Sequence, residues 1–332
     1  MRTTFLATSL FVLSSTVPLS GQGLTTTPSM FSDSWGTFAI AAPLGRSRLF
    51  FQHWHRGDQL GGRILVREIG WRQSDRSTSL PAVTHTMEVV LSNTTAGFQL
   101  SKTFAQNLGT STTFLKMKSV SFPRKTAAPK DPNVPTLWIK GDAPFIYRGP
   151  NFIYQVDLQT SPSWGSSGYN VDGYSTSSTP IHRQGQASCG GSLTATYAAG
   201  NYTLTMRGAP ASTQALMCIS GNLTLVDLGA FFGTGCKWSV DPLLWVVVPV
   251  NASGTATLSL PWTVSTSDTL VLHAQGLHVK SSSPRGLVPT NVAHSALGPA
   301  GLNMYVYNWT RGGPVAQYGP YGTNRGPIIL LR

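Results

Sequence analysis

The chain has 332 residues and is strongly basic, although few of its side chains are charged. Lysine and arginine number 24 against 12 acidic residues, for a formal net charge of +12, and only 11% of all residues carry charge. Glycine (34) and proline (22) together make up about a sixth of the chain. This composition is poor material for helices and is typical of short strands joined by tight turns. The length allows two domains of ordinary size.

Residues 1–23 have the pattern of a secretory signal peptide. Arg2 precedes the apolar run Phe5–Leu19, which is too short to span a bilayer permanently, and Gly21–Gly23 offers small residues to a signal peptidase. We therefore expect a secreted protein, extracellular or at the cell surface. No later apolar stretch is long enough to cross a membrane, so we expect no transmembrane anchor.

Apolar and polar side chains alternate along much of the chain. In the segment that begins at Thr84, His85, Met87, Val89 and Leu91 share one face. Similar strand patterns occur at Phe152–Leu158, Asn201–Arg207, Leu244–Val250, Thr255–Leu260, Leu270–Val279 and Pro327–Leu331. The one helical candidate, Ser101–Gly109, is a turn or two long. The sequence predicts an all-β fold with little helix, in which two antiparallel β-sandwich domains are of jelly-roll or Ig-like type.

A shift in composition suggests where these domains divide. Between Thr160 and Ser188 the chain is rich in serine, glycine and threonine and has little apolar periodicity. We predict an N-terminal β-sandwich over 24–160 and a linker or long loop over 161–188. A C-terminal β-sandwich with an irregular tail would then occupy 189–332.

Three cysteines fit an oxidising compartment, which permits one disulfide and leaves one thiol. Cys189 and Cys236 stand beside glycines, in "SCGG" and "GTGC", as bridging cysteines in loops often do. Cys218 lies in the apolar run "ALMCI", where a thiol packs as a small hydrophobic group. We predict a Cys189–Cys236 disulfide, with Cys218 buried and free.

The excess of positive charge indicates a class of partner. The basic residues are spread along the chain, with no run longer than Arg124-Lys125, and acidic residues are scarce. An exported protein meets little nucleic acid, so we expect no nucleic-acid partner. The charge indicates weak affinity for glycans or anionic cell-surface polymers, and no motif calls for a cofactor.

The stretch "RLFFQHWHRGDQLGGR" (Arg48–Arg63) contains two histidines that a strand would place on one face. His53 and His55 could both reach one zinc ion, but a zinc site needs a third protein ligand that no spacing specifies. Neutral histidines on a strand need no metal. We therefore interpret the stretch as a strand running into a turn, with His53 and His55 as weak metal candidates.

The loop "WGSSGYNVDGY" is the best ligand-binding candidate in the sequence. Trp164, Tyr169 and Tyr174 could stack on sugar rings, although such aromatic residues often cap the edge of a sandwich core instead. Catalytic signals are weaker, since the twelve acids are scattered and no G-x-S-x-G motif occurs. We predict no catalytic residues.

Longer stretches of the chain resemble a family of proteins. "LFFQHW", "GGRILVREIGWR", "HTMEVVLSNTTAGFQLSKTFAQNLGT" and "DAPFIYRGPNFIYQVDLQT" resemble the N-terminal module of secreted, uncharacterised proteins of planctomycete-type bacteria. "SCGG", "NYTLTMRGAPASTQALM", "VVVPVNASGTATLSLP" and "LVLHAQGLHV" are similar to their C-terminal module, with its paired cysteines. The resemblance spans most of residues 45–290, and the tail from about 291 departs from it. It implies extracellular β-sandwiches and transfers no catalytic residues.

These observations favour an exported, non-enzymatic protein of the cell surface or extracellular matrix, with weak glycan binding. The alternative is a secreted polysaccharide-acting hydrolase whose site is assembled from loops. Two facing carboxylates with raised pKa would favour the hydrolase.

Overall fold

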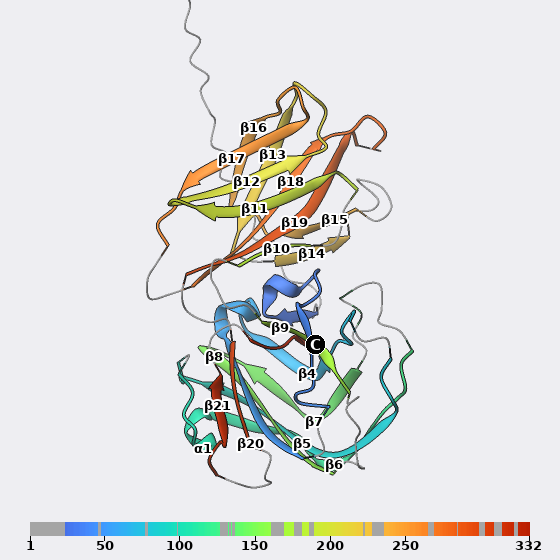
Figure 1. Ribbon diagram of the computed structural model, residues 1–332, viewed down its shortest axis with the longest axis vertical. Helices are drawn as coiled ribbons and strands as arrows, with labels where there is room; N and C mark the ends of the chain where they lie inside the picture. Colours follow the sequence, from blue (N-terminus) through green and yellow to red (C-terminus); the bar gives the residue numbers. More distant parts are fainter. Residues whose placement is uncertain are drawn as a thin grey trace, which may run out of the picture. The chain divides into compact units, whose positions relative to one another are not determined.

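The computed structural model describes residues 24–332 except 46–47, 77–78, 98, 127–131, 133, 135–136, 161–168, 176–180, 186–188, 222, 228–235, 265–268, 284, 299–302, 309–313 and 322–324. The predicted signal peptide therefore lies outside the described residues. Strands dominate the rest, as predicted (Figure 1). Within the described residues, helix is limited to the single turn α1 (Phe104–Asn107), within the expected segment, and the short 3-10 helices η1 (Ser29–Phe31) and η2 (Gly57–Leu60).

The chain forms two compact units, and the sequence of one is inserted into the sequence of the other. The discontinuous domain comprises residues 21–179 and 299–332, and the inserted domain comprises residues 180–298. This division corrects the predicted boundaries, because the tail after residue 298 belongs with the N-terminal part of the chain. The predicted linker also contains strands at 171–175 and 181–184.

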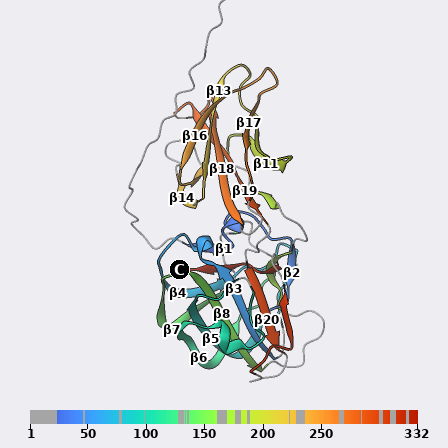
Figure 2. The ribbon, with the colours of Figure 1, turned by 90° about the vertical axis from the view of Figure 1, so that its left-hand side faces the viewer.

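The largest sheet of the discontinuous domain has six antiparallel strands. Their order is β21 (Tyr318–Tyr321), β20 (Asn303–Asn308), β3 (Leu49–Arg56), β8 (Asn151–Thr160), β5 (Val83–Thr94) and β6 (Thr110–Phe122). The period-two pattern of β5 is realised as predicted, because His85, Met87, Val89 and Leu91 are buried. In Figure 2 the red strand β20 lies beside the blue strand β3, with which it pairs.

Two smaller sheets complete this domain. One has the order β1 (Thr25–Thr27), β23 (Ile329–Leu331), β4 (Ile64–Trp71) and β7 (Leu137–Tyr147); the other has the order β2 (Phe38–Ile40), β9 (Val171–Ser175) and β22 (Arg325–Pro327). One hydrophobic core joins side chains of the six-stranded and four-stranded sheets, among them Phe51, Val89, Ile69, Ile139 and Ile329.

The C-terminal tail returns to the discontinuous domain because its side chains complete this core. Tyr305, Ile329 and Leu331 are buried in it, at 6% exposure or less. The backbone of β23 pairs on one side with β1 and on the other with β4. Without the tail, β3 would lose its β20 neighbour and β4 would lose β23.

The inserted domain also consists of antiparallel sheets. Its five-stranded sheet has the order β10 (Ile181–Gln184), β19 (Leu287–Leu297), β18 (Leu270–Val279), β13 (Gln214–Ser220) and β16 (Leu244–Pro249). A three-stranded sheet contains β11 (Ser192–Ala198), β12 (Asn201–Arg207) and β17 (Thr255–Pro261), and a hairpin contains β14 (Leu223–Asp227) and β15 (Lys237–Val240). Leu193, Leu204, Met217 and Leu272 share a core between the two larger sheets.

A fully buried ion pair links the segment after β4 to β9 in the discontinuous domain. Arg72, just after β4, and Asp172, on β9, lie 2.8 Å apart, with neither side chain exposed. Nη1 of Arg72 donates to the carbonyls of Phe31 and Pro132, and Nη2 donates to the carbonyl of Ser34. Four acceptors thus surround one guanidinium, as a buried arginine requires.

The carboxylate of this pair is also hydrogen-bonded. The backbone N–H of Gly36 donates to both of its oxygens at 3.1 Å. Burial raises the pKa of Asp172 to about 6, although Arg72 and the Gly36 bond act in the opposite direction. The cost of removing the carboxylate from water is therefore larger than the stabilisation that its partners return.

We expect Arg72→Met to destabilise the discontinuous domain by about 3–5 kcal/mol, because it leaves a buried carboxyl without its counter-charge. A carboxyl whose pKa is raised by folding loses stability as the pH rises through that value, and loss of Arg72 raises the pKa of Asp172 further. The deficit should therefore be larger at about pH 7.5 than at about pH 5. Urea denaturation followed by circular dichroism measures it. Arg67→Met, at an exposed position of β4, should stay within about 0.5 kcal/mol of the wild type; equal losses in both variants would refute the expectation.

Candidate functional site

The predicted aromatic loop does not form an accessible platform. Trp164 lies outside the described residues, and Tyr169 and Tyr174 are buried, at 0% and 1% exposure. Tyr174 lies on β9 with its ring 4.7 Å from that of Phe31, and Tyr169 packs with its ring 5.7 Å from Phe122. The two tyrosines therefore belong to the core: Tyr174 is carried there by β9, and Tyr169 packs there just before β9 begins. Of the two roles considered for these tyrosines, stacking on sugar and packing on the core, the structure shows the second.

The two histidines of β3 are core residues of the six-stranded sheet. His53 and His55 are fully buried and their ring centroids are 4.1 Å apart. Nδ1 of His53 lies 3.1 Å from the hydroxyl of Tyr154, and Nδ1 of His55 lies 3.0 Å from Oγ1 of Thr27. Burial, and secondarily His53, holds the pKa of His55 well below its usual value, so that this imidazole is neutral.

A metal site would need a third ligand beside this pair. Among the described residues, no group of three or more histidine, cysteine, aspartate or glutamate side chains could hold a metal ion. The interpretation of Arg48–Arg63 as a strand running into a turn agrees with the observed β3 and η2. Gly61 ends η2 with a φ of 68°, a left-handed conformation that favours glycine.

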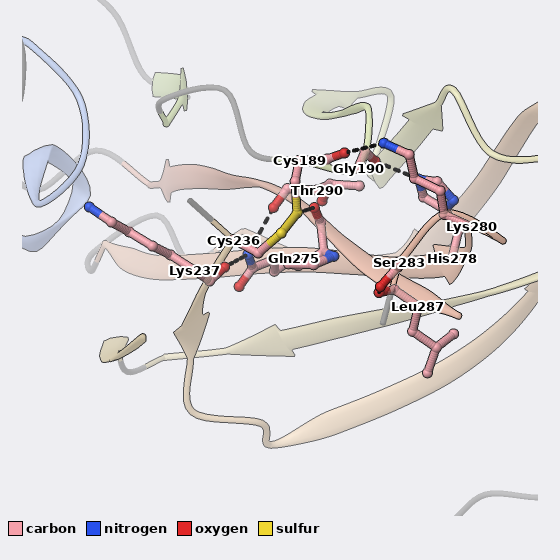
Figure 3. The surroundings of a disulfide bond; sticks show 11 residues. Cys189, Gly190, Cys236, Lys237, Gln275, His278, Lys280, Ser283, Leu287 and Thr290 are labelled. Atoms are coloured by element: carbon pink, nitrogen blue, oxygen red, sulfur yellow. Dashed lines mark hydrogen bonds between the residues drawn. A yellow bond between two sulfur atoms is a disulfide. The ribbon is translucent and has the colours of Figure 1, made fainter. Parts of the chain in front are cut away.

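The predicted disulfide is present in the inserted domain (Figure 3). Cys189 and Cys236 have Cα atoms 5.4 Å apart and are 47 residues apart in the chain. Cys236 stands directly before β15, and Cys189 lies three residues before β11, the first strand of the three-stranded sheet. The crosslink therefore attaches the β14–β15 hairpin to the start of β11. Cys218 is buried and free, also as predicted.

Hydrogen bonds from polar side chains hold the surroundings of the disulfide. Nε2 of Gln275 donates to the carbonyls of Lys237 and Thr290, both at 2.8 Å, and Lys280 donates to the carbonyl of Cys189 at 3.1 Å (Figure 3). Gln275 is itself buried, at 1% exposure. These bonds tie the hairpin to β18 and β19, so the disulfide region is a structural joint.

Two carboxylates lie side by side on the six-stranded sheet. Glu88 of β5 and Asp157 of β8 are directly opposite partners in the antiparallel register, and both are partly buried. Directly opposite side chains share a face and lie close together. Burial, followed by the negative charge of Asp157, raises the pKa of Glu88. Oδ2 of Asp157 accepts a hydrogen bond from Gln159 at 3.2 Å.

This carboxylate pair is not recognisable in the sequence, because 69 positions separate Glu88 from Asp157. Each acid sits at a polar position of an alternating strand, which the pattern alone assigns to solvent. Only the pairing of β5 with β8, and the register of that pairing, brings them together. A sequence signal could have been found only by aligning the two strands in register.

The tail carries a group of tyrosines that no sequence motif indicates. Tyr307 of β20 and Tyr318 of β21 are opposite partners, with ring centroids 5.1 Å apart and planes 18° apart. Tyr305 continues the row, 6.1 Å from Tyr307. Tyr318 is 37% exposed, whereas Tyr305 is 6% exposed. The row therefore runs from the core to solvent at the β20–β21 edge, and we call Tyr307 and Tyr318 the tyrosine platform.

A hollow of about 490 Å³ lies where β5 begins and β6 ends. It is lined by Ala82, Val83, Thr84, Ser121, Phe122 and Pro123. The two hydroxyl groups in this lining lie 2.9 Å apart and bond to each other. No ionisable side chain lines it, so the hollow offers no acid–base chemistry.

Comparisons with known proteins add no identification. No family model, curated protein or solved structure matches the chain at a significant level. The resemblance to planctomycete-type secreted proteins therefore stays a prediction. None of the helices in the described parts of the chain is long and apolar enough to cross a membrane.

The cysteine arrangement predicts a definite thiol count. We expect almost no reaction of the native, oxidised protein with a thiol reagent. Cys218 is the free thiol, and it is buried, which raises its pKa to about 12. One thiol should react after denaturation and three after denaturation with reduction. Colourimetric titration gives each number. Three reactive thiols in the unreduced, denatured protein would contradict the crosslink.

Proposed function

We propose that this protein is exported and acts without catalysis at the cell surface or in the extracellular matrix, where it binds glycans weakly. The Cys189–Cys236 crosslink supports export, because disulfides form and persist in oxidising compartments. The signal-peptide pattern of residues 1–23 supports the same localisation. In this proposal the domains are two β-sandwiches of jelly-roll or Ig-like type. The core shared by the six-stranded and four-stranded sheets supports that arrangement.

The tyrosine platform is the observation that carries glycan binding. The apolar face of a sugar ring packs on a flat aromatic ring, and a phenol adds a hydroxyl group that can bond to the sugar. Tyr318 presents a partly exposed ring that Tyr307 supports from one side. The platform takes the role that the sequence analysis gave to Trp164, Tyr169 and Tyr174.

The net charge of +12 is compatible with glycans that carry carboxylate or sulfate groups. Because exposed charges are screened by salt, any such contribution should weaken as ionic strength rises. Stacking on tyrosine is much less sensitive to salt. A charged glycan and a neutral glycan therefore differ in the salt dependence of binding.

We expect Tyr318→Ala to weaken binding to a polysaccharide by at least about ten-fold, because it removes the exposed ring. Tyr318→Phe keeps the ring and should retain most of the affinity. Affinity electrophoresis or sedimentation with insoluble cell-wall polysaccharide measures both. If wild type and Tyr318→Ala bind equally, the platform is not the glycan site.

A second candidate function, hydrolysis of a polysaccharide, is favoured by the Glu88–Asp157 pair. Glycoside hydrolases use two carboxyl groups, one as an acid and the other as a base or nucleophile. A raised pKa suits a carboxyl to the acid role, which here falls to Glu88. Asp157 would then take the base or nucleophile role.

Hydrolysis and binding predict different outcomes for the carboxylate variants. If the pair is catalytic, wild-type protein releases reducing ends from polysaccharide, and Glu88→Gln and Asp157→Asn each lose at least about 100-fold of that activity. Glu68→Gln is the matched control, since Glu68 pairs with Arg332 on another sheet. The first proposal predicts no release by any of the four proteins. A reducing-sugar assay over a panel of polysaccharides distinguishes the two.

A further inference from the structure

The four-stranded sheet of the discontinuous domain has basic side chains on the face turned away from the core. In β4, Val66 lies in the core and Ile64 packs against it. Because successive side chains of a strand point to opposite faces, Arg63, Leu65 and Arg67 lie on the outer face. Arg63 and Arg67 are exposed, and Leu65 is partly buried. This side of β4 therefore presents two arginines with one apolar side chain between them.

A β-bulge turns the side chain after Arg67 to the same face. The N–H groups of Arg67 and Glu68 both donate to the carbonyl of Arg332, at 2.7 and 2.8 Å, so that two residues of β4 oppose one. Val66 and Ile69 on either side of the bulge are fully buried. Glu68 also forms an ion pair with the guanidinium of Arg332. The carboxylate on this face therefore already has a cationic partner.

Strand β7 adds a third cation and a second apolar side chain. Lys140 is directly opposite Glu68, and Ile146 is directly opposite Leu65. Lys140 is exposed, and Ile146 is 47% exposed. Directly opposite side chains share a face, so both lie on the outer face of the sheet.

A second arginine approaches Arg63 at one end of the two strands. Ile64 is opposite Tyr147, Arg63 directly precedes the first of these partners and Arg148 directly follows the second. The antiparallel register therefore brings the two arginines together, and both are exposed. Like charges in this arrangement repel each other, and a bound anion removes the repulsion. We call the basic face the set Arg63, Arg67, Lys140 and Arg148.

The described part of the domain does not neutralise these charges. Within the described residues, no ion pair involves Arg63, Lys140 or Arg148. Asp142, the acid of β7, pairs instead with Lys118 of β6. The basic face therefore presents positive charge that is available to a partner.

We propose that the basic face binds an anionic polysaccharide, with carboxylate or sulfate groups along its chain. The inference rests on the proposed glycan function and names the class of its ligand. Three of the four cations are arginine, and a guanidinium donates two parallel hydrogen bonds to such an oxyanion. Leu65 and Ile146, between the cations, provide apolar contact for the C–H groups of a sugar ring.

The spacing of the cations suits an extended polymer. Neighbouring strands lie about 5 Å apart, and alternate residues of one strand lie about 7 Å apart. From Arg63 to Arg67 the row is therefore about 13 Å long, which is more than one small anion can cover. A lipid bilayer is bound through apolar side chains that insert below its surface, whereas the side chains of this face are mainly charged.

Salt separates the basic face from the tyrosine platform. The platform lies on the six-stranded sheet, at the β20–β21 edge, and binds by ring stacking. The basic face acts through exposed charges, whose range falls from about 10 Å at 0.1 M salt to about 3 Å at 1 M. Binding at the basic face is therefore sensitive to salt.

Binding of the full-length, disulfide-bonded protein to dextran sulfate and to dextran tests the proposal, because the two polymers share a backbone and differ in charge. At about 50 mM NaCl we expect the wild type to bind dextran sulfate at least ten-fold more tightly than dextran, and to lose most of that difference at about 1 M. Biolayer interferometry on immobilised polymers measures both affinities. Equal affinity for the two polymers at low salt would overturn the proposal.

A double variant, Lys140→Gln with Arg148→Gln, should bind dextran sulfate at least ten-fold more weakly than the wild type. The matched control combines Arg48→Gln with Lys102→Gln. It removes the same two kinds of charge from exposed positions outside the four-stranded sheet. Thermal melting followed by circular dichroism verifies that both proteins are folded. Equal losses in the two double variants would show an effect of net charge alone and would refute the basic face.

Tyr318→Ala distinguishes this inference from the proposed platform. Binding of dextran sulfate that survives Tyr318→Ala but is lost in the Lys140 and Arg148 double variant supports the basic face and counts against the platform. The reverse result supports the platform and overturns the inference. Tighter binding to vesicles of anionic phospholipid, or to duplex DNA, than to dextran sulfate would assign a different partner and also overturn it.

Discussion

The guanidinium of Arg72 and the carboxylate of Asp172 lie 2.8 Å apart with no exposure to solvent, and the discontinuous domain is arranged around them. Backbone hydrogen bonds run beside the ion pair, since the N–H of Asp172 donates to the carbonyl of Arg72 and the N–H of Ile328 donates to the carbonyl of Asp172. Three remote parts of the chain therefore meet at one point. A buried charge that lost these partners would be costly, so few other arrangements of the segments are acceptable.

The segments that meet at the Arg72–Asp172 ion pair show why the domain needs both ends of the chain. Strands from the first 95 residues and from the last 30 residues are neighbours in the same sheets, with the inserted domain between them in sequence. The core cannot close until β20 and β23 are available, because β20 flanks β3 and β23 separates β1 from β4. Contacts of such large sequence separation slow folding and leave strand edges exposed until the tail arrives.

Local chemistry allowed much of the fold to be predicted from the sequence. The alternation in β5, the short helical turn near Phe104 and the glycine-flanked cysteines Cys189 and Cys236 depend on neighbouring residues, and the structure contains each as expected. The return of the tail depends on which strand edge remains open after the other strands have paired. That information is not present in the tail itself, so the domain boundary was predicted incorrectly.

The same distinction applies to the candidate sites. Tyr169 and Tyr174 lie in a segment whose composition is that of a loop, but β9 fills a place between β2 and β22 and carries the side chain of Tyr174 into the core. Glu88 and Asp157 meet only through strand register. Composition describes what a segment can tolerate, whereas burial and proximity are set by the strands that pair with it.

The register also shows that the two candidate sites of the six-stranded sheet are independent. Tyr307 is opposite Phe51, which lies in the core between sheets, whereas Asp157 is opposite Phe50, which packs on the other face with the residues around Phe104. Opposite partners share a face, so the tyrosine platform and the carboxylate pair lie on different faces of one sheet. A single sugar ring cannot contact both. A glycan held by Tyr318 is therefore not positioned for attack by Glu88 and Asp157, and stacking at the platform supports binding without supporting hydrolysis.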